Sequence, residues 1–362
     1  MRVFCGVARP ALTLTTRHLN RALLARQGLL ERSDAGVLDT VEHLVGMQAQ
    51  EPENPYVALW SRLRDFEPQE LSGLIAERRA VRTAVLRGTI HLVSARDCLA
   101  MHPLTLPLMA QLFRSSWQRR VGGAPVDEVA TAGRELLEQG PRTRAELSAA
   151  LGPRWPEGEA IALAYAVTYH LPLVQVPPRG LWKGRGQARW ALVEQWLDEP
   201  PDGEGSAEAL VLRYLAAFGP ATVSDARIWS RLTGLREVFE RLRPGLRTFR
   251  DEHGRELFDV PDGLLADPDV PAPPRFMPEY DNAMLGHADR SRLDGRGPGE
   301  PFPPGPTRGW LLVDGFYRAN WHLADGTLHI DRFERRKGDP PGTEEAIEAE
   351  AAALAEFLQS GQ

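Results

Sequence analysis

The sequence predicts an α+β protein made of tandem winged-helix (helix-turn-helix) units followed by a small β-rich C-terminal region. One observation is a helix joint that occurs twice: Gly140-Pro141 and Gly219-Pro220 each end a helix, and Thr143 and Thr222 begin the next. An acidic residue follows three positions after each threonine, which is the pattern of a capping box. The second observation is that each helical stretch is followed by an apolar segment with internal glycine, which is typical of a β-hairpin.

The composition indicates a globular protein of two or three domains. The 362 residues are 43% hydrophobic and 25% charged, which is ordinary for soluble proteins. No apolar run approaches the roughly 20 residues that a membrane-spanning helix needs. The two cysteines, Cys5 and Cys98, offer neither a disulfide framework nor a metal cluster, and the nine histidines are scattered. We therefore expect a reduced, cytoplasmic protein that binds no metal.

The first winged-helix unit is expected over residues 13–122, after a flexible N-terminus at residues 1–12. Thr16 is expected to cap the first helix. Alternating β-branched residues around Gly88 predict a wing-like hairpin over Val81–Val93. Helices of this unit are expected near residues 16–27, 37–45, 55–63 and 71–78.

Two more units and a β-rich region are expected after it. Residues 123–197 form the second unit, residues 198–206 an acidic linker, and residues 207–267 the third unit. Their hairpins are expected over Leu173–Trp190 and Leu246–Val260. In the region 268–362, Asp314-Gly315 and Asp325-Gly326 lie between alternating apolar runs, which is a strong hairpin signal. Strands near 309–313, 316–323 and 327–333, and a closing helix near 343–358, are expected there.

The charge is unevenly distributed along the chain. The net charge is −6, but six arginines stand against the single acid Asp97 between residues 82 and 120, and the chain from Asp339 onward holds six acids and no base. Such a protein can present a basic face to phosphates in spite of its negative total. Of the 43 basic residues only Lys183 and Lys337 are lysines. A high-GC genome that favours arginine codons is the alternative explanation.

The segment Gln48-Ala49-Gln50 is the first candidate site. Gly46 can end the preceding helix, and Pro52 favours an extended conformation for the residue before it. In an extended chain, Gln48 and Gln50 aim their amides to the same side. Two converging amides can orient a water molecule or line a polar pocket. The alternative is a pair of solvated loop residues.

A second polar segment surrounds Tyr280 and Met284. It contains Asp281, Asn282, His287, Asp289 and Arg290. Two structural interpretations remain open for it: an ion pair between Asp289 and Arg290, and a buried, hydrogen-bonded His287. Neither this segment nor the rest of the sequence has the spacing of a metal site or of a glycine-rich phosphate loop. We expect no cofactor.

Four stretches resemble the AlkZ-type DNA glycosylase superfamily, in the family's order and over nearly the whole chain from about residue 13. They are Gln48-Ala49-Gln50 with Asn54-Pro55-Tyr56, the stretch Arg87–Val93, the stretch Pro278–Arg292, and Leu312–Phe316 with Trp321. The first is similar to the family's Gln-apolar-Gln motif. The resemblance implies tandem winged helices arranged as a C-shaped clasp around duplex DNA.

The resemblance also implies an activity. Members of the superfamily hydrolyse the N-glycosidic bond of N7-alkylguanine, and some unhook interstrand crosslinks made by alkylating antibiotics, which would serve self-resistance. One branch has Asp in place of the second Gln, so Gln50 puts this chain nearer the crosslink-associated branch. Gln48 and Gln50 are then the catalytic residues of a monofunctional, monomeric enzyme that acts on double-stranded DNA containing alkylated bases.

Neutral amides suit this reaction. Alkylation at N7 makes guanine cationic and therefore a good leaving group, so the enzyme needs a positioned water rather than a strong acid. A glutamine oxygen can accept a hydrogen bond from that water, although it cannot act as a base. We expect DNA contacts from Arg87, His91, Arg114, Arg119, Arg120, Lys183, Arg185, Asn282, His287, Arg290 and Arg318.

Two alternatives of other classes remain at the level of sequence. In a non-enzymatic winged-helix transcriptional regulator, the glutamine pair is incidental and the protein dimerises to insert one recognition helix into each half-site. In a purely structural interaction protein, the helices serve only protein contacts, and the basic glycine-rich hairpins have no purpose. A glycosylase, by contrast, should act as a monomer on DNA of unrelated sequence.

Overall fold

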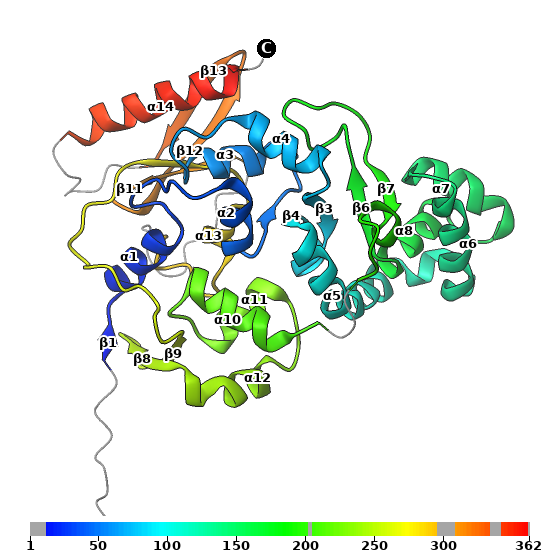
Figure 1. Ribbon diagram of the computed structural model, residues 1–362, viewed down its shortest axis with the longest axis horizontal. Helices are drawn as coiled ribbons and strands as arrows, with labels where there is room; N and C mark the ends of the chain where they lie inside the picture. Colours follow the sequence, from blue (N-terminus) through cyan, green and yellow to red (C-terminus); the bar gives the residue numbers. More distant parts are fainter. Residues whose placement is uncertain (1–11, 202–204, 295–307, 334–341, 361–362) are drawn as a thin grey trace, which may run out of the picture.

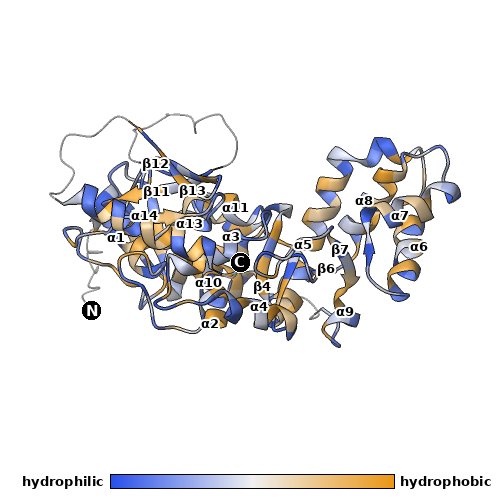
Figure 2. Ribbon diagram, turned by 90° about the horizontal axis from the view of Figure 1, so that it is seen from above, coloured by the Kyte–Doolittle hydropathy of each residue, from blue (hydrophilic) through white to orange (hydrophobic). Residues whose placement is uncertain are grey.

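The computed structural model describes residues 12–201, 205–294, 308–333 and 342–360. It is an α+β protein in which helices surround three small sheets. Figure 1 shows one large body and a lobe of α6, α7 and α8 that extends to one side of it. Figure 2 shows the same lobe from above, standing apart from the body. The expected flexible N-terminus lies almost wholly outside the described residues. None of the described helices is long and apolar enough to span a bilayer.

The first part of the chain contains the expected helices and hairpin. The cap of α1 is Thr15 rather than Thr16, because the side chain of Thr15 accepts the hydrogen bond from the His18 N–H. The long helix α5, which contains Pro103 and Pro107, was not expected from the sequence. The elements are β1 (Thr13–Leu14), α1 (Thr16–Arg26), α2 (Val37–His43), β2 (Met47–Gln48), α3 (Asn54–Trp60), α4 (Pro68–Ala76), β3 (Ala80–Ala84), β4 (Ile90–Ser94) and α5 (Ala95–Ser116).

The middle of the chain confirms both predicted helix joints. The side chains of Thr143 and Thr222 cap their helices, and Glu146 and Asp225 complete reciprocal capping boxes. The elements are α6 (Val126–Glu138), β5 (Arg142–Thr143), α7 (Arg144–Leu151), α8 (Ala160–His170), β6 (Leu173–Val176), β7 (Arg189–Leu192), α9 (Val193–Trp196), α10 (Ala207–Phe218), α11 (Val223–Ser230), α12 (Leu235–Leu242), β8 (Arg247–Asp251) and β9 (Glu256–Asp259).

The last part forms a sheet with one helix beside it. Both Asp-Gly turns have positive φ at both residues, as a type I′ hairpin turn requires. The short strand β10 pairs with β11 and was not expected. The elements are β10 (Arg275–Met277), α13 (Asn282–Leu285), β11 (Gly309–Val313), β12 (Phe316–Ala324), β13 (Thr327–Arg332) and α14 (Thr343–Gln359).

The sheets cross the boundaries that the sequence suggested. The hairpins β3–β4 and β6–β7 join edge to edge through β3 and β6, so that six strands run in the order β2-β4-β3-β6-β7-β5. The strand β1 pairs with β8, about 240 residues later in the chain. Each pairing covers a strand edge that would otherwise expose unpaired backbone groups.

Buried ion pairs also join distant segments. Arg26 of α1 donates to both carboxylate oxygens of Asp259 in β9, at 2.7 and 2.8 Å. Arg62, after α3, donates to both oxygens of Asp281, at 2.9 and 2.7 Å. All four side chains are almost completely buried. Removing one partner of such a pair would leave an uncompensated buried charge, so these contacts fix how the segments meet.

Candidate active site

The Gln-Ala-Gln segment begins as an edge strand. Gln48 in β2 lies opposite His91 in β4, and the N–H of Ala49 donates to the carbonyl of Ile90 at 2.8 Å. Gly46 turns the chain into this strand with φ +88°, and a Cβ there would lie 2.7 Å from Val93 Cγ1. Glycine is therefore required both by the backbone conformation and by the close packing.

The two glutamines differ in exposure. Gln48 is buried, with 9% of its surface exposed, whereas Gln50 is exposed in the bend that follows β2. Both lie outside helices, as the extended segment between Gly46 and Pro52 predicted.

Arg87 lies beside Gln48 and contacts three other polar groups. Its Nη2 donates to Gln48 Oε1 at 3.4 Å and to Asn282 Oδ1 at 3.1 Å, and lies 3.1 Å from His91 Nε2. Its Nη1 donates to the carbonyl of Trp229, in the last turn of α11, at 2.7 Å. Three of the four stretches that carry the family resemblance meet here: those containing Gln48, Arg87 with His91, and Asn282.

The turn between β3 and β4 aims Arg87 inward. Arg87 has φ +58°, a left-handed conformation that is uncommon for a residue with a side chain. Gly88 follows with φ +71°, and a Cβ on it would lie 2.3 Å from Leu112 Cδ1 of α5. Strained backbone of this kind persists where the surroundings over-determine it, and it is frequent at functional sites.

His91 is neutral in this environment. Its Nδ1 lies 2.9 Å from the carbonyl of Thr89, so Nδ1 carries the hydrogen and Nε2 accepts from Arg87. Burial, with the nearby Arg87 charge, lowers the pKa of His91 to about 3. Burial and the neighbouring Arg290 lower the pKa of Arg87 to about 10, so it stays charged at neutral pH. Within the described ranges, no carboxylate forms an ion pair with Arg87.

Asn282 joins the C-terminal segment to the glutamine strand. Its Nδ2 donates to the carbonyl of Gly46 at 2.8 Å, which leaves Oδ1 to face Arg87. The preceding Asp281 caps α13 and forms the buried pair with Arg62. A cavity of about 10 Å³ lies between these residues and Gln48, which is close to the space that one water molecule needs.

Arg82 supports the segment from beneath. It is 2% exposed and donates from Nη2 to the carbonyl of Ala49, between the two glutamines, at 2.7 Å. Its Nε and Nη1 are buried without a hydrogen-bond partner. Burial, followed by the charge of Arg179, lowers the pKa of Arg82 to about 10.

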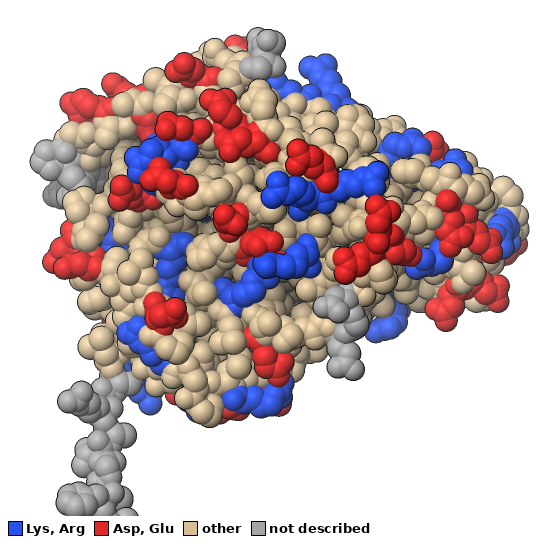
Figure 3. All heavy atoms as spheres, viewed as in Figure 1, with Lys and Arg blue, Asp and Glu red and all other residues tan. Residues whose placement is uncertain are grey.

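The remaining predicted DNA-contact residues lie in different environments. Arg114, Arg119 and Arg185 are exposed, and Arg290 and Arg318 are partly buried. Arg120 is exposed but forms an ion pair with Glu159 and lies over the ring of Trp117. The predicted basic stretch 82–120 is therefore not one basic face, because Arg82 and Arg87 turn inward. In Figure 3, positive and negative side chains alternate over the face in view.

The structure does not place His287 where it could contact DNA, as the sequence suggested. It is 1% exposed, and its Nε2 bonds to the carbonyl of Phe218 at 2.9 Å. Burial and the neighbouring Arg292 lower its pKa, so the ring is neutral. The structural alternative that the sequence left open, a buried and hydrogen-bonded histidine, is the one observed. Asp289 pairs with Arg255 rather than with its neighbour Arg290.

The β6–β7 hairpin is docked on the protein, which also changes the interpretation of Lys183. The Lys183 ammonium donates to the carbonyl of Ser360 at 2.9 Å, at the end of α14. The Trp182 ring is tilted against the rings of Tyr56 and Phe357, with centroid distances of 4.9 and 5.2 Å. Lysine near a helix C-terminus complements the helix dipole, so this hairpin fastens α14. No local sequence signal distinguishes such a hairpin from a free wing.

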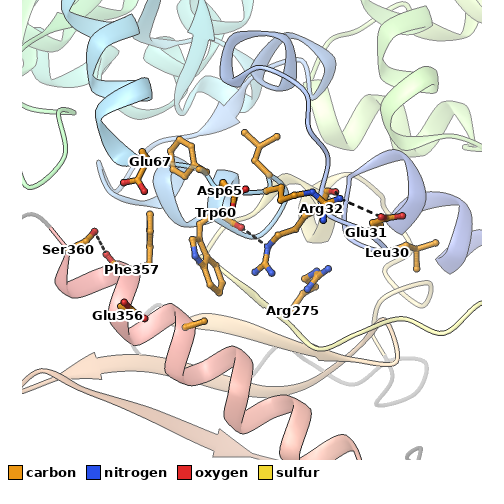
Figure 4. Close-up of a pocket in the computed structure, with 14 residues that line it drawn as sticks. Leu30, Glu31, Arg32, Trp60, Asp65, Glu67, Arg275, Glu356, Phe357 and Ser360 are labelled. Carbon is orange, nitrogen blue, oxygen red and sulfur yellow. Dashed lines mark hydrogen bonds and ion pairs between the residues drawn. The ribbon is translucent and has the colours of Figure 1, made fainter.

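A larger cavity of about 640 Å³ lies where α14 meets the loops around α3 and α4. Figure 4 shows the aromatic side chains of Trp60 and Phe357 and the guanidinium groups of Arg32 and Arg275 among the residues that line it. Arg32 lies over the ring of Trp60, and Glu350 pairs with both arginines, at 2.7 and 3.3 Å. Both arginines are thus already paired, and none of the predicted site residues lines this cavity.

Comparison with known proteins assigns this chain to a family of DNA glycosylases. The AlkZ-like DNA glycosylase family matches residues 41–357, and the chain therefore belongs to that family. The "Interstrand DNA cross-link repair glycosylase" of Streptomyces sahachiroi is 25% identical over 371 residues, covering 92% of this chain and 93% of that protein. The solved structure of Streptomyces sahachiroi DNA glycosylase AlkZ matches with a TM-score of 0.74 at 21% identity, covering 96% of this chain and 97% of that one. Family membership decides between the alternatives of the sequence in favour of the enzyme.

Proposed function

We propose that this glycosylase hydrolyses the N-glycosidic bond of N7-alkylated guanine in duplex DNA, with water as the nucleophile. The observation that carries the proposal is the environment of Gln48. A buried neutral amide lies at the end of β2, bordered by Arg87, the neutral His91 and Asn282. Such a site can orient a water but offers no strong acid to a leaving group, so it suits a base that is already cationic.

Gln48 and Gln50 act on the water and on the developing positive charge of the sugar. Gln48 Oε1 has two lone pairs, of which one faces Arg87 and the other is available to a water. Gln50, in the bend that follows β2, supplies a second amide from the exposed side. Removing one such preorganised group typically costs about 100-fold or more in rate.

The absence of a lysine nucleophile among the site residues supports hydrolysis by a monofunctional enzyme. Lyase chemistry through a Schiff base requires a reactive amine. The Lys183 ammonium is engaged at the end of α14. Lys337 lies outside the described residues. We expect borohydride to trap no covalent protein–DNA product.

The protein would hold the duplex as a monomeric, C-shaped clasp. The clasp would consist of three winged-helix units, over residues 13–122, 123–197 and 207–267, with residues 268–362 as the β-rich region. The element order α6-β5-α7-α8-β6-β7 supports this for the second unit, since it follows the winged-helix sequence of one helix, a short strand, two helices and a hairpin. The order α10-α11-α12-β8-β9 supports it for the third, where Ala221 bridges to Phe258 in the position of the short strand.

The test is excision from a duplex with a single N7-methylguanine, with alkali to reveal abasic sites. The Gln48→Ala, Gln50→Ala double variant should keep its thermal transition and duplex affinity and lose excision by at least about 100-fold. Gln69→Ala, at an exposed glutamine of α4, is the matched control and should excise like wild type. Excision by the double variant at the wild-type rate would refute the assignment.

A second arm of the same assay uses an interstrand-crosslinked duplex. The Streptomyces sahachiroi relative is named for crosslink repair. Because this chain carries Gln50 at the position where another branch of the family has Asp, we propose that it also unhooks crosslinks. Excision of the monoadduct without unhooking would limit the function to monoadducts.

A further inference from the structure

The guanidinium of Arg87 is surrounded by hydrogen-bond acceptors that belong to the protein itself. Its Nη2 carries two hydrogens and faces three acceptors, which are Gln48 Oε1, His91 Nε2 and Asn282 Oδ1. Its Nη1 is bound to the Trp229 carbonyl. A guanidinium has five donors in a fixed fork, and here most of that fork is directed into the protein. Little of it is left to reach a phosphate.

We propose that Arg87 is a positioning residue that acts through Gln48. It holds the side-chain amide of Gln48 with the oxygen toward the guanidinium, and it ties that amide to α11 and to the Asn282 segment. The inference rests on the proposed function, because it assigns Gln48 to the water. It replaces the direct DNA contact that the sequence suggested for Arg87.

The neighbours of Arg87 fix the direction of each hydrogen bond. His91 commits the hydrogen on Nδ1 to the Thr89 carbonyl, so only its Nε2 lone pair can face Arg87. Asn282 commits Nδ2 to the Gly46 carbonyl, so only its oxygen can face Arg87. With both neighbours fixed as acceptors, the guanidinium also selects the oxygen of Gln48, and the Nε2 group must point away.

The charge of Arg87 is balanced without an acid. Among residues with described positions, no carboxylate pairs with it. The Trp229 carbonyl belongs to the last turn of α11, where the unpaired carbonyl groups of a helix carry partial negative charge. An acid in this position would compete with Gln48 for the guanidinium, whereas a helix end does not. The site therefore keeps its cation while Gln48 keeps a neutral amide.

A double-mutant cycle tests whether Arg87 acts through Gln48. The variants are Arg87→Met, which keeps the length of the side chain without its donors, Gln48→Ala, and the two combined. Single-turnover excision is measured at saturating protein, and duplex affinity is measured separately. We expect Arg87→Met to lower the rate about 100-fold in the wild-type background and less than about threefold in the Gln48→Ala background. Duplex affinity should change less than about threefold. Arg96→Met removes an exposed arginine that pairs with Glu42 and is the matched control, expected to excise like wild type.

Two results would overturn the proposal. Equal losses in both backgrounds would mean that Arg87 does not act through Gln48. Weaker duplex binding with a smaller salt dependence, at an unchanged rate, would make Arg87 a phosphate contact. If Arg87→Met does not fold, Arg87→Lys replaces it in the cycle, because one ammonium cannot reach both Trp229 and the three acceptors of Nη2.

A wild-type protein that excises nothing would refute the proposed function and not this inference. In that case the positioning role is tested by the NMR resonances of the Gln48 side-chain amide, in protein labelled with ¹⁵N-glutamine. These resonances are assigned by their loss in Gln48→Ala. Arg87→Met should shift this pair and leave the Gln69 pair unmoved. An unchanged Gln48 pair would overturn the positioning role.

Discussion

Acidification should destabilise the protein through its buried neutral histidines, among them His91 and His102. The folded-state pKa is about 3 for His91 and about 4 for His102, against 6.5 for an unperturbed histidine. Both values are lowered, so the unfolded chain binds the protons first. The stability that these residues contribute is complete above pH 6.5 and is lost as the pH falls toward the folded-state values.

The contacts explain why the folded protein resists protonation. The Thr83 hydroxyl donates to the Leu173 carbonyl and lies 3.0 Å from His102 Nε2, so Nε2 carries the hydrogen and donates to it. The second nitrogen, Nδ1, is buried without a partner, and a proton there would have no acceptor. In His91, a proton on Nε2 would face the N–H of Arg87.

The magnitude follows from the difference in proton uptake. Between pH 7 and pH 5 an unfolded histidine becomes almost fully protonated while the buried one does not, which costs about 2 kcal/mol per residue and about 4 kcal/mol for the pair. Urea unfolding of wild type and His102→Gln at pH 7, 6 and 5 measures it. The variant should lose about 2 kcal/mol less than wild type over this range. His253→Gln, at an exposed position, is the control. Parallel pH dependences for wild type and His102→Gln would refute the reasoning.

Three further predictions concern the site and the surface. In Gln48→Glu, the new carboxylate should pair with Arg87 at the 3.4 Å seen for the amide, which is an attraction of about 5 kcal/mol at an effective dielectric constant of 20. The variant should therefore have a higher thermal transition and excise at least about 100-fold more slowly. Excision at the wild-type rate would contradict this. Arg119→Ala should weaken binding to any duplex and reduce the slope of log K against log salt by about 1. Arg120→Ala should reduce that slope less, because Glu159 already pairs with Arg120. An unchanged slope for Arg119→Ala would mean that Arg119 does not contact DNA. Trp182→Ala should lower the free energy of unfolding by about 3 kcal/mol and increase hydrogen exchange in α14. Unchanged exchange there would show that the β6–β7 hairpin does not hold that helix.

Local chemistry made much of the fold predictable. The capping boxes at Thr143 and Thr222 involve residues three apart, so the sequence alone contains the whole interaction. The Asp314-Gly315 and Asp325-Gly326 turns likewise depend on the conformations that these residues tolerate. The hairpin positions followed from alternation, which also depends only on neighbours.

Long-range contacts were not predictable in the same way. The sequences of the β3–β4 and β6–β7 hairpins do not indicate that β3 pairs with β6, with Arg82 opposite Gln175. The local sequence around Lys183 is that of a winged-helix hairpin, and its contact with Ser360 at the end of α14 depends on the tertiary fold. The direction of Arg87 was missed for a related reason, because the three side-chain acceptors that face its Nη2 come from positions 48, 91 and 282. A positive-φ arginine before glycine is the one local feature that could have raised the question.

The use of a glutamine rather than an acid at position 48 follows from this arrangement. A carboxylate beside an acid-free guanidinium would form a strong, charge-assisted pair, and its lone pairs would then be held by Arg87 rather than offered to a water. An amide oxygen bonds the same guanidinium more weakly, as the 3.4 Å separation indicates, and retains a lone pair for a second donor. The exposed Gln50 is not among the acceptors of Arg87. A carboxylate there would not be captured in this way, which gives a physical reason for position 50, and not position 48, to be the one where a branch of the family carries Asp.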